Sequence, residues 1–82
     1  MITEENKAFV SIRYELKHLI EKESSKKVYQ YDYYKWRVSR NFRPNKLLDL
    51  LKLEFKEYDV EIMFMDYDEA PCYSIYLYRK DV

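Results

Sequence analysis

The chain contains no glycine, and this absence excludes whole classes of binding site. Glycine supplies the positive-φ positions of tight turns and allows the backbone to approach a phosphate group closely. Glycine-rich phosphate loops, which hold nucleotides at the start of a helix, therefore cannot form here. The turns of this protein have to be built from Asn, Asp, Ser and Pro instead.

Histidine and cysteine are almost absent, with His18 and Cys72 as single representatives. One cysteine cannot form a disulfide within the chain, and no His-x-x-His, Cys-x-x-Cys or Gly-x-Ser-x-Gly motif occurs. The acidic run 66–69 offers carboxylates, but a calcium loop also needs a glycine turn and more oxygen ligands. We therefore predict that the protein is not an enzyme and uses no metal ion or cofactor. His18 is interpreted as a solvated surface residue and Cys72 as a packing or surface thiol.

Long apolar runs are also lacking. No window reaches the roughly 18 consecutive apolar residues that a membrane-spanning helix needs, and the polar start of the chain does not resemble a signal peptide. These features predict a cytoplasmic protein without a membrane partner. The length of 82 residues predicts one domain, residues 1–82, with a small core.

Aromatic residues, in contrast, are abundant at 18% of the chain. Four of the ten tyrosines and the single tryptophan fall within residues 28–43, where they alternate with lysine and arginine. Each buried aromatic side chain removes about 150–250 Å² from water, which compensates for the short chain. The segment fits either an amphipathic strand with a basic wet side or a surface that contacts a partner.

Charge is segregated along the chain although the net charge is zero. Residues 26–46 contain seven lysines and arginines against one aspartate, and residues 54–69 contain seven acidic residues against one lysine. Either the two blocks lie side by side and neutralise each other, or the molecule is dipolar. In the second case its basic side would meet nucleic acid or an acidic protein surface.

Two helices are predicted. The first covers residues 4–23, with Thr3 as its N-cap, and the second covers residues 44–58, with Pro44 at its first position. Apolar residues recur at three- and four-residue steps in both, as a helix lying on a core requires. These residues are Phe9, Ile12, Leu16, Leu19 and Ile20 in the first helix, and Leu47, Leu48, Leu51, Phe55 and Tyr58 in the second.

Three strands are predicted at residues 28–38, 60–65 and 73–78. The last two form a hairpin in which Ile62 faces Ile75, because this register also pairs Val60 with Leu77 and Phe64 with Tyr73. In the first strand we expect the even positions to face the helices and the odd positions to face outward. The even positions in question are Val28, Tyr34, Trp36 and Val38.

The predicted fold class is therefore α+β, in the order α-β-α-β-β, with both helices on one face of a three-stranded sheet. An alternative makes Asp32 an N-cap and residues 33–40 a short helix. The order α-α-α-β-β would then be similar to a winged helix-turn-helix, although this similarity rests on element order alone. A groove-reading helix needs an exposed polar face, whereas residues 44–58 carry leucine on two sides.

The second face of the sheet has no helix left to cover it, and we predict that it binds another protein. Tyrosine, methionine and arginine are enriched in such contacts. The predicted partner-binding residues are Tyr29, Tyr31, Tyr33, Lys35, Arg37, Met63, Met65, Tyr76 and Tyr78.

Three functions compete for this face. The first is a small adaptor or inhibitor. The bias toward Lys, Glu, Ile, Tyr and Asn fits an AT-rich genome, and small single-domain proteins without catalytic residues are common on bacterial mobile elements. The second is nucleic-acid binding or transcription regulation, with bases stacked on tyrosine and phosphates held by basic residues. The third is a homodimer that buries the face between two copies. The basic residues of the second interpretation are Lys35, Arg37, Arg40, Arg43 and Lys46.

Overall fold

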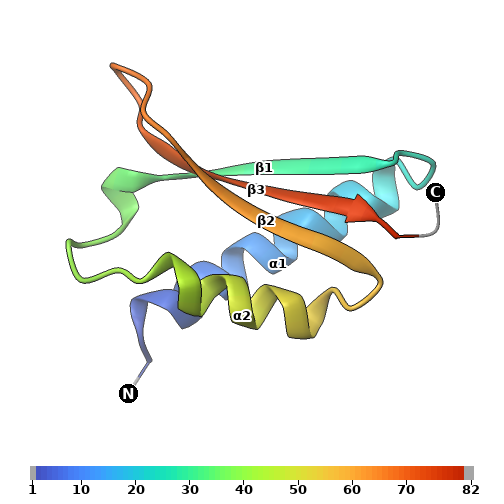
Figure 1. The fold of residues 1–82 in the computed structure, drawn as a ribbon, viewed down its shortest axis with the longest axis horizontal. Helices are drawn as coiled ribbons and strands as arrows, with labels where there is room; N and C mark the ends of the chain where they lie inside the picture. Colours follow the sequence, from blue (N-terminus) through green and yellow to red (C-terminus); the bar gives the residue numbers. More distant parts are fainter. Residues whose placement is uncertain (1, 81–82) are drawn as a thin grey trace.

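The computed structural model describes residues 2–80, and its elements follow the predicted order (Figure 1). Two helices and three strands are joined by short connections, with one 3₁₀ turn after the first strand. The elements are α1 (Glu4–Lys22), β1 (Val28–Tyr34), η1 (Lys35–Arg37), α2 (Pro44–Glu54), β2 (Tyr58–Met65) and β3 (Cys72–Arg79). The α+β class is confirmed.

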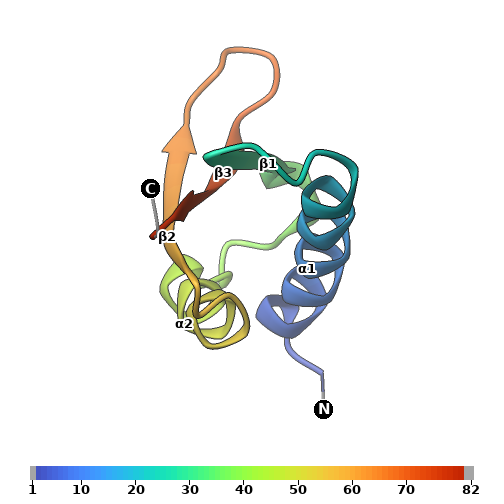
Figure 2. The ribbon, with the colours of Figure 1, turned by 90° about the vertical axis from the view of Figure 1, so that its right-hand side faces the viewer.

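The three strands form an antiparallel sheet in the order β1-β3-β2, so the last strand of the chain lies in the middle. Both helices lie on the same face of this sheet, with α1 against β1 and α2 against β2 (Figure 2). The core fills the space between the two layers. No element of residues 2–80 covers the opposite face.

Helix α1 begins as predicted. The Thr3 hydroxyl accepts a hydrogen bond from the amide of Asn6 at 3.1 Å, which satisfies one of the free amides of the first turn. Ile12 and Leu16 are fully buried, whereas Val10 and Tyr14 point to solvent. The predicted apolar stripe is therefore the face that packs on the core.

Helix α2 starts at Pro44 but ends at Glu54, four residues before the predicted end. The Phe55 amide donates to the carbonyl of Leu51, and the Tyr58 amide donates to the carbonyl of Phe55 in the next turn. Residues 55–57 turn the chain back toward the sheet, and Tyr58 is the first residue of β2. The burial of Leu47 and Leu51 confirms the predicted packing face.

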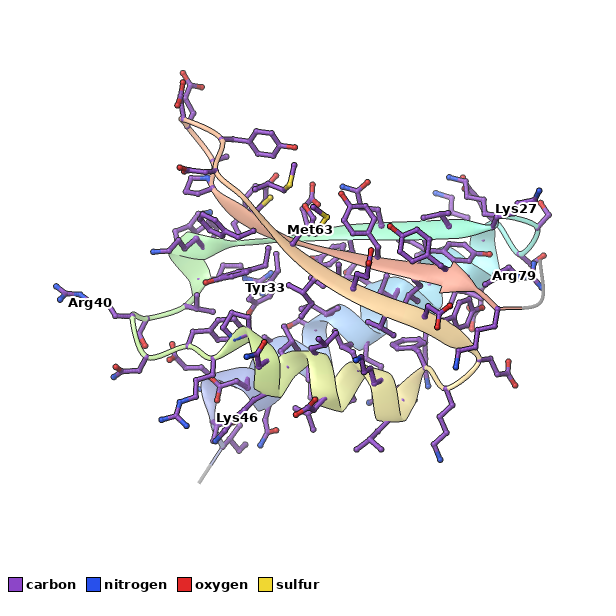
Figure 3. All side chains as sticks on the ribbon, viewed as in Figure 1. Lys27, Tyr33, Arg40, Lys46, Met63 and Arg79 are labelled. Carbon is purple, nitrogen blue, oxygen red and sulfur yellow. The ribbon has the colours of Figure 1, made fainter. Side chains whose placement is uncertain are left out.

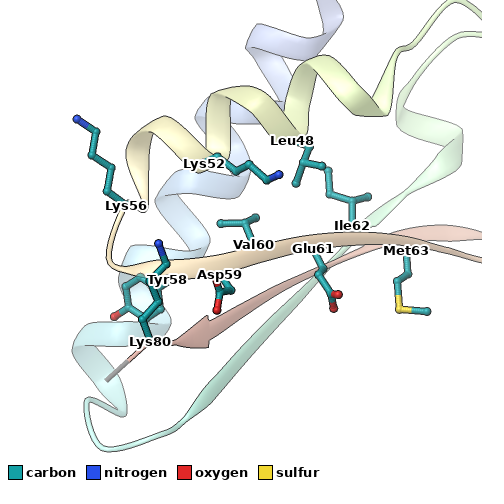
Figure 4. Close-up of a pocket in the computed structure, with 10 residues that line it drawn as sticks. All are labelled: Leu48, Lys52, Lys56, Tyr58, Asp59, Val60, Glu61, Ile62, Met63 and Lys80. Carbon is teal, nitrogen blue, oxygen red and sulfur yellow. The ribbon is translucent and has the colours of Figure 1, made fainter. Parts of the chain in front are cut away.

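The hairpin of β2 and β3 has the predicted register. Ile62 is opposite Ile75, and the flanking apolar pairs follow on the same face. Figure 4 shows Val60 and Ile62 directed toward α2, whereas Glu61 and Met63 point away from it. The acidic segment 66–71 connects the two strands.

The predicted orientation of β1 is wrong, because its odd positions face the helices. Tyr29 and Tyr33 are 3% and 4% exposed, and they lie opposite Leu77 and Tyr73 of the helix-facing side. The strand also ends at Tyr34, which leaves Trp36 outside it and 79% exposed.

The physical reason for this orientation is the polarity of the even positions. They include Gln30 and Asp32, whose burial under the helices would leave an amide and a carboxylate without water. Tyrosine tolerates burial when its hydroxyl has a partner. The Tyr29 hydroxyl donates to the carbonyl of Glu23 at 2.6 Å and so satisfies this condition.

The winged-helix alternative is also excluded. Asp32 lies within β1 and caps no helix, and η1 is a single turn of three residues. The segment that the alternative assigned to a helix is therefore mostly strand end, 3₁₀ turn and connector.

Carboxylates of α1 hold the connector between η1 and α2. Glu4 accepts hydrogen bonds from the amide and the hydroxyl of Ser39 at 2.7 and 2.5 Å, and Glu5 accepts one from the amide of Arg43 at 3.0 Å. Phe42, between these two anchors, is buried with its ring 5.3 Å from the ring of Tyr73. The connector thus closes one end of the core.

Candidate functional site

The uncovered side of the sheet, here called the open face, is the first candidate site. It consists of the even positions of β1 and β3 and the odd positions of β2, because side chains alternate along a strand. These residues are Val28, Gln30, Asp32, Tyr34, Asp59, Glu61, Met63, Met65, Cys72, Ser74, Tyr76 and Tyr78.

A hydrogen-bonded polar line crosses the middle of the open face. The Ser74 hydroxyl donates to Oδ1 of Asp32 at 2.8 Å, and Nε2 of Gln30 donates to the same oxygen at 3.0 Å. Ser74 and Cys72 are almost fully buried although no helix covers them. The larger side chains on the neighbouring strands therefore shield the small central residues, and the face is packed before any partner arrives.

Tyr76 and Tyr78 form a stacked pair at one end of the face, with ring centroids 6.1 Å apart. Partial burial raises the pKa of Tyr78, and a hydrogen bond to the carboxylate of Glu61 raises that pKa further. The phenol of Tyr78 therefore stays neutral at neutral pH and is the donor in this bond. Tyrosine held this way loses little conformational entropy on binding.

Half-exposed apolar side chains surround this polar centre. Tyr34 is 41% exposed, Val28 42% and Met63 50%, and the far more exposed Trp36 follows Tyr34 by two residues. The open face carries three carboxylates and no lysine or arginine. It is therefore an apolar and acidic surface, which repels phosphate groups.

The structure divides the predicted partner-binding residues into two groups. Met63, Met65, Tyr76 and Tyr78 lie on the open face as expected. The tyrosines at the odd positions of β1 instead face the helices, and Figure 3 shows Tyr33 within the body of the molecule. The latter group comprises Tyr29, Tyr31 and Tyr33.

Lys35 and Arg37 also lie outside the open face, because both belong to η1. The Arg37 guanidinium lies over the ring of Tyr33, 4.2 Å from its centroid, and thus packs on an aromatic residue of the core side. Sequence reasoning missed Tyr34 and Val28 as surface residues of this face. Gln30 and Asp32 lie on the same side of β1, and their polarity is the sequence signal that could have identified this side as the outer one.

Four of the predicted nucleic-acid-binding residues lie in the segment that joins β1 to α2, and Lys46 lies in the first turn of α2. Figure 3 shows Arg40 and Lys46 at one end of the molecule. All five side chains are exposed, and within residues 2–80 none of them forms an ion pair. These residues are Lys35, Arg37, Arg40, Arg43 and Lys46. They form a basic surface separate from the open face.

The second candidate site is a groove of about 690 Å³ between α2 and the outer edge of β2 (Figure 4). Lysine side chains line part of the groove, and β2 supplies both apolar and acidic residues to it. Its lining residues are Leu48, Lys52, Lys56, Tyr58, Asp59, Val60, Glu61, Ile62, Met63 and Lys80. Sequence reasoning missed this groove. The groove exists because β2 lies at the edge of the sheet, and that position depends on the strand order, which the sequence pattern does not give.

The chain matches no known protein family, and comparison with curated proteins and with solved structures gives no match. Among residues 2–80, no three His, Cys, Asp or Glu side chains gather in a way that could hold a metal ion. Neither helix in this part of the chain has the length and apolar character needed to cross a membrane. The candidate sites are thus defined by geometry alone.

Proposed function

We propose that the protein is a non-enzymatic adaptor or inhibitor that binds another protein through the open face. The observation that carries this proposal is a sheet face with half-exposed tyrosine, valine and methionine that no helix of residues 2–80 covers. Small proteins that expose large apolar side chains on an uncovered face commonly use that face as a contact. Tyrosine and methionine are among the residues enriched in such contacts.

The charge of the open face defines the partner further. Asp32, Asp59 and Glu61 lie among its apolar residues, and no basic residue balances them on that face. A complementary surface therefore presents lysine or arginine where it meets these carboxylates and apolar groups where it meets the tyrosine, valine and methionine side chains. The stacked tyrosines and the bonded Asp32 are already ordered, which reduces the entropy lost on association.

A nucleic-acid function is the second candidate, and it would use the basic surface instead. Trp36 is 79% exposed and stands between Lys35 and Arg37, so a base could stack on the indole while the neighbouring cations bind phosphates. The acidic open face would take no part in this binding. The two candidates thus depend on different residues.

The test compares two triple variants by affinity capture from host lysate, with and without nuclease. Val28→Asp, Tyr34→Ser and Tyr76→Ser alter the open face, whereas Val10→Asp, Tyr14→Ser and Leu53→Ser remove similar apolar groups from exposed helix positions. We expect nuclease-resistant capture by the wild type and the helix variant and its loss in the open-face variant, with circular dichroism unchanged in both. Retained capture by the open-face variant would contradict the proposal.

The nucleic-acid candidate is tested by changing Arg37, Arg40 and Arg43 to glutamine. If it is correct, the wild type binds single-stranded oligonucleotides with an affinity that falls steeply with salt, because phosphate contacts release counterions. The glutamine variant would then lose binding while the open-face variant keeps it. These two results together would favour the nucleic-acid function over the protein-binding proposal.

A further inference from the structure

Strand β2 lies at the edge of the sheet, and no other strand of residues 2–80 pairs with its outer side. In an antiparallel ladder, residues alternate between those that bond to one neighbour and those that bond to the other. The Lys35 amide donates to the carbonyl of Pro71, and the Arg79 amide donates to the carbonyl of Lys27. The odd residues of β3 therefore bond to β1, and its even residues bond to β2.

The alternation then continues across β2. Its odd residues bond to β3, so Val60, Ile62 and Phe64 direct their amides and carbonyls to the outer edge. Phe64 is 46% exposed, and Ile62 and Leu48 are half-buried beside this edge. An unpaired edge with adjacent apolar side chains is a template for another strand.

We propose that β2 of a second copy occupies this edge, antiparallel, about a two-fold axis at Ile62. The two sheets then form one continuous sheet with the helices of both copies on the same side. Ile62 faces Ile62 of the partner subunit, and Val60 faces Phe64 of the partner subunit. The apolar wall of the groove is covered in both copies at once.

Neighbouring registers are less favourable. An axis at Glu61 places this carboxylate opposite its own copy, and like charges directly opposite destabilise a strand pair. An axis at Met63 places Val60 opposite Asp66 of the partner subunit. With the axis at Ile62, Glu61 faces a methionine, and Val60, Ile62 and Phe64 on the helix side all face apolar residues. Tyr58 faces Asp66 of the partner subunit, where its hydroxyl can meet the carboxylate.

Charge complementarity supports the same register. Beyond Met65, the chain of the partner subunit continues into the acidic segment 66–69 and runs past Tyr58. Lys56 and Lys80 line this end of the groove, and both are exposed (Figure 4). The acidic connection of one copy therefore meets lysines of the other, and the two-fold axis repeats this contact.

The register is tested by disulfide formation between variants that each carry one added cysteine. Glu61 and Met63 of the partner subunit form a non-hydrogen-bonded pair, with Cα atoms about 4.5 Å apart, which suits a disulfide. Glu61→Cys and Met63→Cys proteins are mixed, with the wild type, whose Cys72 is buried, as the control. We expect crosslinks between the two variants and few within either one. Crosslinking within Glu61→Cys alone, or none at all, would overturn the proposed pairing.

The partner is tested by sedimentation of charge-reversed variants. Asp66→Lys with Asp68→Lys, and Lys56→Glu with Lys80→Glu, should each weaken self-association by at least about tenfold, because like charges then meet. Mixing the two proteins should restore association, since both contacts become attractive again. All four positions are exposed, so folding is preserved. A monomeric wild type would overturn the proposal, and so would a mixture that associates as weakly as either variant alone. The edge would then be available to a strand of another protein.

Discussion

The ionisation of Glu4 is coupled to the fold through its hydrogen bonds to the connector. Hydrogen bonds from the hydroxyl and then from the amide of Ser39 lower the pKa of Glu4 below its ordinary value of 4.5. The carboxylate form is therefore the one that holds the connector. The stabilisation is complete above about pH 4.5 and is lost as the pH falls through the lower folded-state pKa.

Replacing Glu4 with glutamine should accordingly destabilise the protein at neutral pH and have little effect in acid. Urea unfolding at pH 7 and pH 3 measures the difference, with Glu21→Gln on the exposed side of α1 as the control. A loss of stability from Glu4→Gln that is equal at both pH values would show that charge is not the cause.

At the scale of the element, the hairpin and β1 show what an amphipathic pattern can predict. Val60, Ile62 and Phe64 alternate with acidic residues and methionine, so one face of β2 is clearly more apolar. A one-residue slip would place Glu61 in the core, and the register is thereby determined. The hairpin half of the open face follows from the same reasoning.

The alternation in β1 is ambiguous, because tyrosine occurs on both sides. Tyr29 and Tyr33 on one face compete with Tyr34 and the nearby Trp36 on the other, and hydropathy does not separate them. Gln30 and Asp32 on the even side favour the observed orientation, and contacts made in the fold support it, including the bond from the Tyr29 hydroxyl to a backbone carbonyl and the bond from Ser74 to Asp32. Ser74 lies 42 residues from Asp32, so this contact cannot be read from periodicity.

Adjacent tyrosines of β1 should therefore differ sharply in their effect on stability. Tyr33→Ala removes a buried ring that Arg37 covers and should cost about 3–5 kcal/mol, the range for large aromatic truncations. Tyr34→Ala, on the open face, should cost less than about 1 kcal/mol. Denaturant unfolding of both variants gives the comparison. Equal costs would contradict the orientation of the strand.

For the whole molecule, the strand order places the basic block and the acidic block of the sequence on separate surfaces. The basic block contains β1 and the acidic block contains β2, and β3 keeps these strands at opposite edges. None of the ion pairs within residues 2–80 joins one block to the other. A chain of zero net charge thus presents an acidic face and a basic connector, and each can attract a different kind of surface.

Pairing of β2 edges would also contribute to the stability of the fold. A chain of 82 residues removes only about 60% of its unfolded surface from water, so a second copy adds a substantial share of burial. Because association stabilises the folded state by mass action, the midpoint of thermal unfolding should rise with protein concentration. Above the dissociation constant, the expected rise is about 3–6 °C for each tenfold increase. The Lys56→Glu, Lys80→Glu variant should unfold at a lower midpoint than the wild type at the same concentration, because its self-association is weaker. A wild-type midpoint that does not depend on concentration would show that each copy is stable without its neighbour.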